Sequence, residues 1–178
     1  MPGPVFLKGD RLTLRVAKQS DDAFLVRLWN AESVRYPSGL RGPFSADDVA
    51  DVVGGEDDCR FLACRDEEPV GDILLQDVDW TTRQCELGYA IDPDESGQGY
   101  ATEAADLALK HAFDGMGIHR VHAKVVEGND ASMRVLEKLG FEREGVLREA
   151  HYNQYGDYED WHLFGLLESE WDPTVTTN

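Results

Sequence analysis

The chain has 178 residues, of which 42% are hydrophobic and three are cysteines without a metal-binding spacing, so we expect a folded domain that needs neither disulfide bonds nor a metal. With 35 acidic against 17 basic residues, the formal net charge is −18, which argues against binding to nucleic acid or to an anionic membrane. No apolar run reaches the roughly 20 residues that span a bilayer, and the amino-terminal residues lack a secretory-signal pattern, so we expect a cytoplasmic protein.

The first half of the chain predicts strands with two helices among them. Residues 12–16 alternate apolar and polar side chains, as a half-buried strand does. The polar residues 20–22 can cap a helix whose apolar face carries Phe24, Leu25, Leu28 and Trp29. Ser45 with Asp48 three residues later resembles a capping box, which predicts a short helix to about Val53. Further strands are expected at residues 60–65, 70–78 and 85–91.

The second half of the chain alternates helices with strands. Alanines recur at three- and four-residue spacing over residues 101–112, which predicts a helix that packs closely against its neighbours. A strand is expected at residues 121–125 and a second helix at residues 129–140. The aromatic-rich tail predicts a hairpin of two strands that turns at residues 153–157. This order indicates an α+β domain with a mixed central β-sheet of about seven strands and about four helices.

One stretch of the second half has the features of a ligand site. A strand ends at a proline turn, and Gly97 and Gly99 follow it directly before the alanine-rich helix. Such glycines let the backbone approach a ligand, and the first free N–H groups of a helix form an anion site suited to a pyrophosphate. A P-loop is excluded because no Gly-Lys-Ser/Thr follows, and a dinucleotide fingerprint fails at Thr102. An ordinary strand–turn–helix connection is the alternative explanation of the glycines.

The residues around these glycines, Ser96-Gly97-Gln98-Gly99-Tyr100-Ala101, resemble the acyl-CoA signature of the GNAT superfamily of N-acetyltransferases, Gln/Arg-x-x-Gly-x-Gly/Ala. A second block, Asn129-x-x-Ser132 with residues 134–141, and a third, from Glu144 to Leu167, follow in the order of the family. Together the blocks are most similar to the branch that acetylates the N-termini of ribosomal proteins.

The resemblance implies one GNAT domain over residues 8–171, a short tail at residues 172–178, and a parallel strand pair at the acetyl-CoA site. The cofactor contacts that it implies fall on the following residues: Tyr89, Ile91, Gly97, Gln98, Gly99, Tyr100, Ala101, Thr102 and Asn129. Asn129 could equally serve as a helix cap. Two positions depart from the family pattern. Ser96 stands where Gln or Arg is usual, and Leu136 stands where many relatives carry a tyrosine that protonates the leaving thiolate.

The resemblance also implies direct transfer of the acetyl group to an amine, without an acyl-enzyme. It places Glu86 beside the amine as its base, with a solvent-facing strand glutamate as the alternative. Ser132 would protonate the departing thiolate, and its alternative role is helix capping. Cys85 is not expected to be a nucleophile because no histidine partner is visible, and His151 in the tail is a reserve base.

The sequence therefore predicts an acetyl-CoA-dependent N-acetyltransferase whose acceptor is the α-amine of a protein or peptide N-terminus, without a metal. A small-molecule amine acceptor, such as a polyamine or an antibiotic, and a non-catalytic acyl-CoA-binding module are the alternatives. Glu149, Tyr158 and Asp160 are expected to face the acceptor groove, and a homodimer is left open. Because the acidic residues are dispersed along the chain, they favour adaptation to high salt over attraction of a cationic substrate.

Overall fold

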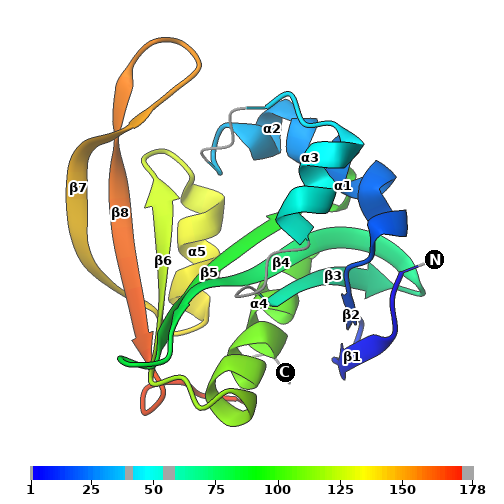
Figure 1. Ribbon diagram of the computed structural model, residues 1–178. Coiled ribbons are helices and arrows are strands. Elements are labelled where there is room, and N and C mark those ends of the chain that lie inside the picture. The colour runs from blue at the N-terminus through cyan, green and yellow to red at the C-terminus, as the bar shows by residue number, and fades with distance from the viewer. Residues whose placement is uncertain (1, 39–41, 54–58, 174–178) are drawn as a thin grey trace.

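The computed structural model describes residues 2–38, 42–53 and 59–173, which form one sheet with helices on both faces (Figure 1). The eight strands of these residues are β1 (Val5–Lys8), β2 (Thr13–Val16), β3 (Cys59–Arg65), β4 (Glu68–Asp79), β5 (Gln84–Ile91), β6 (Arg120–Val126), β7 (Glu142–Tyr152) and β8 (Tyr158–Leu167). Their order across the sheet is β1-β2-β3-β4-β5-β6-β8-β7. Every neighbouring pair is antiparallel except β5 with β6, which is parallel.

The helices cover the sheet in two groups. They are α1 (Asp22–Asn30), α2 (Glu32–Arg35), α3 (Ala46–Val53), α4 (Tyr100–Lys110) and α5 (Asp130–Lys138). Helices α4 and α5 contribute to the larger core, where Ala104, Ala105 and Ala108 are fully buried and allow close packing against the strands. Helices α1 and α3 pack with β3 in a second core around Leu25, Leu28 and Leu62. Among the described residues, no helix is long and apolar enough to cross a membrane.

The α+β prediction with a mixed sheet is confirmed, and the structure adds two short elements to it. Strand β1 has four residues, and it pairs with β2 ahead of the expected domain start at residue 8. Helix α2 is a single turn that directly follows α1. The capping box at Ser45 is confirmed, since Ser45 donates its backbone N–H to Asp48 Oδ2 at 2.7 Å. Of the predicted tail at residues 172–178, the residues from 174 onward lie outside the described part of the chain.

The centre of the sheet opens where the parallel strands β5 and β6 diverge. Strand β5 pairs with β6 over residues 84–86 alone, although it continues to pair with β4 as far as Ile91. Beyond Glu86 the edge of β5 that faces β6 makes no strand pairing within the described residues, and Figure 1 shows the two strands spreading apart beside α5. Backbone N–H and C=O groups along this edge are therefore left for another partner.

Candidate active site

Two cavities adjoin at the opening between β5 and β6. The first, of about 500 Å³, lies over the strands and is called the sheet cavity. The second, of about 420 Å³, lies at the loop between β5 and α4 and is called the loop cavity. Tyr89, Ala90, Asn129 and Ser132 line both cavities. A long ligand bound in the loop cavity can therefore present one end to a second ligand in the sheet cavity.

The loop cavity has the properties of an anion site. Gly97 and Gly99 have φ angles of +77° and +80°, which residues other than glycine rarely adopt. Gly99 immediately precedes α4. No side chain of the described residues caps this end of α4, so its first N–H groups remain for a ligand. Arg134 and Lys138 of α5 line the same cavity and add positive charge. They are four residues apart on one helix face, a spacing that is visible in the sequence but was overlooked there. These groups fit the pyrophosphate of coenzyme A.

Charged contacts hold the glycine loop in place. Arg11 donates from Nη1 to the carbonyl of Gln98 at 2.8 Å and from Nε to Glu103 Oε2 at 2.8 Å. Arg65 binds Glu95 and donates to the hydroxyl of Tyr100 at 3.0 Å. Of the predicted cofactor residues, Gln98 alone does not line the loop cavity, and its carbonyl serves this scaffold instead.

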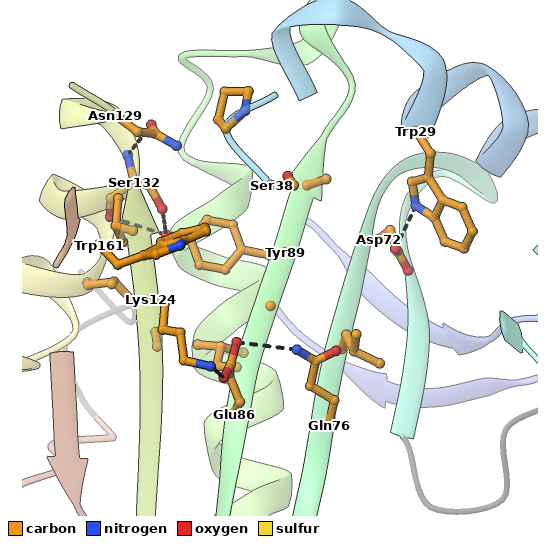
Figure 2. A pocket seen from close by; sticks show the side chains of 18 of the residues that line it. Trp29, Ser38, Asp72, Gln76, Glu86, Tyr89, Lys124, Asn129, Ser132 and Trp161 are labelled. Atoms are coloured by element: carbon orange, nitrogen blue, oxygen red, sulfur yellow. Dashed lines mark hydrogen bonds and ion pairs between the residues drawn. The ribbon is translucent and has the colours of Figure 1, made fainter. Parts of the chain in front are cut away.

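Glu86 lies in the sheet cavity with its side chain only 12% exposed, so it is not a solvent-facing strand residue. Its carboxylate accepts from Lys124 Nζ at 2.6 Å and from Gln76 Nε2 at 3.3 Å (Figure 2). It also lies 3.4 Å from His122 Nε2. Burial raises the pKa of Glu86, but the contacts with His122 and Lys124 outweigh burial, and the pKa lies below its ordinary value. The carboxylate is therefore ionised at neutral pH.

Ser132 lies on the first turn of α5 at the junction of the two cavities. Its backbone N–H donates to Asn129 Oδ1 at 3.2 Å, so Asn129 caps the helix. The hydroxyl of Ser132 instead lies 2.7 Å from the hydroxyl of Tyr89. Burial raises the pKa of Tyr89 to about 12, against the lowering effect of its bond with Ser132, so the phenol stays protonated. The sequence placed Tyr89 among the cofactor contacts, but its phenol as a partner of Ser132 was missed.

Several residues considered from the sequence take no part in the cavities. Burial raises the pKa of the Cys85 thiol to about 12, which removes it as a nucleophile. His151 packs edge-on against Trp161 and does not line either cavity. None of the other histidines in the described residues lines either of these two cavities. Asp160 accepts the backbone N–H of Glu149 at 2.8 Å and does not line the acceptor side. Within the described part of the tail, Trp161 is the residue that reaches the sheet cavity.

A buried ion pair in the wall of the sheet cavity was not anticipated. Asp72 of β4 accepts from Arg60 Nη1 at 2.5 Å and from Trp29 Nε1 at 3.0 Å. Burial raises the pKa of Asp72 above its ordinary value, and the contacts with Arg60 and Trp29, which lower it, offset burial only in part. The three residues come from α1, β3 and β4, so only the fold brings them together. No group of three or more His, Cys, Asp or Glu side chains within the described residues is arranged to hold a metal ion.

Known proteins are similar to this chain in sequence. The family model of the acetyltransferase (GNAT) domain matches residues 11–142. The prophage-derived uncharacterized N-acetyltransferase YokL of Bacillus subtilis (strain 168) is 31% identical over 92% of this chain and 94% of its own. The candidate ribosomal N-acetyltransferase YdaF of the same organism is 33% identical over 57% of this chain and 55% of its own. The spermidine N(1)-acetyltransferase of Escherichia coli (strain K12) is 28% identical over 78% of this chain and 72% of its own.

The matched residues include the glycine loop, the uncapped start of α4, and the strand β5 that carries Glu86. Three findings agree on the family of this chain. They are an anion site that fits coenzyme A, an adjoining cavity for a second substrate, and a family match over most of the chain. The chain belongs to the GNAT family of acetyltransferases and is an acetyl-CoA-dependent N-acetyltransferase.

Proposed function

We propose that this enzyme acetylates the α-amine of a protein or peptide N-terminus. The name of one relative refers to the ribosome and that of another to spermidine, so relatives alone do not choose between the two acceptors. The charge of the sheet cavity supports the peptide. Its two carboxylates, Asp72 and Glu86, are each paired with a cation that also lines the cavity, Arg60 and Lys124. A polyamine carries several positive charges and would need carboxylates without such partners.

An α-amine also suits the base that the cavity offers. The ordinary pKa of an α-amine is about 7.7–8.0, against about 10.4 for an alkylamine such as lysine, so far more of the α-amine is neutral at pH 7. In the proposed reaction the neutral amine attacks the thioester carbonyl, the C–N bond forms and the C–S bond breaks. Glu86 takes the proton that the nitrogen loses, directly or through one water molecule. Because its pKa is lowered, Glu86 is a weak base. A weak base can take the proton from an amine that is itself only weakly basic, as an α-amine is.

The departing thiolate receives its hydrogen bond from Ser132 in this proposal. Ser132 lines both cavities, and Leu136 holds the place where the family resemblance would put a tyrosine. Tyr89 orients the serine hydroxyl from the adjacent strand at 2.7 Å. The free edge of β5 supports binding of the pantetheine arm, and one of its N–H groups could polarise the thioester carbonyl.

A screen of acceptors tests this assignment. Thiol release from acetyl-CoA is measured with peptides that have a free N-terminus, with spermidine, and with an aminoglycoside, and kcat/KM is compared. We expect the peptides to rank first. Higher kcat/KM for spermidine would instead assign a polyamine acceptor, and no thiol release with any of the amines while coenzyme A still binds would favour a binding module.

A further inference from the structure

A third cavity, of about 430 Å³, lies over the paired residues of β5 and β6. Asp77, Arg120, His122 and Glu144 line it, and none of these four lines the sheet cavity. His122 nevertheless reaches the sheet cavity, because its Nε2 lies 3.4 Å from Oε2 of Glu86, its register partner in β5. The side chain of His122 is 27% exposed and that of Glu86 only 12%. His122 therefore joins the largely covered Glu86 to a second cavity.

A base that takes a proton from the amine must pass it on before the next turnover. With an acceptor in the sheet cavity, the carboxylate of Glu86 is covered from that side. Gln76 and Lys124 donate hydrogen bonds to this carboxylate, but an amide does not titrate and an ammonium group has no lone pair to take a proton. Imidazole takes and releases protons near neutral pH. Among the described side chains that contact this carboxylate, His122 is therefore the one that can carry the proton away.

The charged groups around His122 suit a positive charge that forms only briefly. They come from four strands and are the following: Asp77 of β4, Glu86 of β5, Arg120 and Lys124 of β6, and Glu144 of β7. Strand β8 contributes apolar side chains to this cavity. Arg120 is paired with Glu144, and Lys124 with Glu86. Because both cations are paired, an excess of positive charge does not oppose a proton on His122.

We propose that His122 relays the proton from Glu86 to water in the third cavity. The O–H bond of the protonated Glu86 breaks at Oε2, and the proton binds the lone pair on Nε2 of the neutral imidazole. The imidazolium then gives one proton to water, which restores both residues for the next turnover. This inference rests on the proposed role of Glu86 as the base and extends it. It holds for whichever amine is acetylated, so it does not depend on the peptide acceptor.

Two substitutions of His122 separate proton transfer from packing. His122→Gln keeps an amide that can hydrogen-bond to Glu86 but cannot take its proton, and His122→Ala leaves space beside Glu86 for a small base. The relay follows the attack of the amine, so we expect either variant to lower kcat by about 10-fold or more, while kcat/KM changes little. The assays are run above neutral pH, where a glutamate is ionised with or without His122.

Added imidazole tests whether the lost group is a base. In His122→Ala we expect imidazole to restore kcat as its concentration rises. Pyrazole, a ring of the same size that is a far weaker base, should have no effect. His119→Ala is the matched control, because His119 directly precedes β6 and lines none of the three cavities, so imidazole should leave its kcat unchanged. Equal rescue by both rings would show that His122 only fills space and would overturn the inference.

A comparison with Glu86→Gln separates this inference from the proposed function. If Glu86→Gln lowers kcat and a folded His122→Gln does not, Glu86 remains the base and the relay is wrong. If Glu86→Gln leaves kcat unchanged, the proposed base is wrong and the relay falls with it. Because the relay acts only through Glu86, the double variant should lose no more kcat than Glu86→Gln alone, and losses that multiply would contradict the relay. If His122→Ala does not fold, as judged by its melting curve, His122→Gln and the double variant still decide.

Discussion

Glu86 is held by partners from both neighbouring strands, and these contacts determine how its carboxylate titrates. Glu86→Gln should lower kcat by about 10²-fold, the range for loss of a general base. The melting temperature serves as the control for folding. A variant with unchanged kcat and an unchanged pH profile would show that Glu86 does not take the proton.

Lys124 provides a separate test of the same residue. Because Lys124 lowers the pKa of Glu86, Lys124→Met should raise that pKa. Glu86 must be ionised to accept a proton, so the acidic limb of kcat/KM against pH should move to higher pH in the variant. In the unaltered enzyme we expect the break that Glu86 causes to lie below the ordinary carboxyl range, and the slope near neutrality to come from the amine, whose pKa is about 7.7–8.0. An acidic limb that stays in place would contradict the role of the pair.

Ser132 and Tyr89 form a second pair that substitution can separate. Ser132→Ala should lower kcat by about 10-fold while binding of coenzyme A changes little, since a hydrogen bond to a charged group is lost in the reaction. Tyr89→Phe should have a smaller effect, because the serine hydroxyl remains. Equal loss of kcat and of coenzyme A affinity in Ser132→Ala would point to a structural role for the hydroxyl.

The sequence predicted the residues of the cofactor loop better than their partners. Glycines before a helix are a local pattern, so Gly97 and Gly99 could be identified directly. Tyr89 and Ser132 are 43 residues apart, and their contact depends on how α5 sits beside β5. The Asp72–Arg60 pair joins two strands, and strand patterns give the face of a side chain but not its neighbour.

At the scale of elements, the loop between β5 and α4 depends on left-handed backbone at two glycines. Gly99→Val should weaken coenzyme A binding by about 10-fold or more, because a branched side chain at φ +80° costs roughly 1–3 kcal/mol and its Cβ would lie 3.4 Å from Arg11. Gly156→Val is the matched control, since Gly156 has φ +92° in the hairpin turn away from both cavities. Calorimetry of coenzyme A binding makes the comparison, and normal binding by Gly99→Val would place the cofactor elsewhere.

Long elements with a regular pattern were predicted well, and of the four-residue elements only β2, which alternates, was predicted. The alanine spacing gave α4 and the aromatic tail gave the β7–β8 hairpin, because each repeats its pattern over many residues. Strand β1 has the sequence Val-Phe-Leu-Lys, which does not alternate, and helix α2 is a single turn, too short to show a helical period. The opening between β5 and β6, which creates the site, follows from sheet topology rather than from either strand.

At the scale of the whole molecule, a net charge of −18 on 178 residues predicts salt-dependent folding. Repulsion between carboxylates is weakly screened at low salt, where the Debye length is about 30 Å at 0.01 M. The melting temperature should rise steeply toward molar salt. A variant that neutralises the exposed Asp47, Asp51 and Asp94 with asparagine should show a shallower rise. A flat curve for the unaltered protein would contradict adaptation to high salt.

The acceptor nitrogen can be identified directly on a peptide with one free α-amine and one internal lysine. The purified enzyme is incubated with this peptide and acetyl-CoA, and intact mass with fragment ions locates the acetyl group. We expect a single acetyl group on the α-amine and none on a peptide whose α-amine is blocked. Acetylation only of the internal lysine, or only of spermidine added to the same mixture, would contradict the proposed α-amine acceptor.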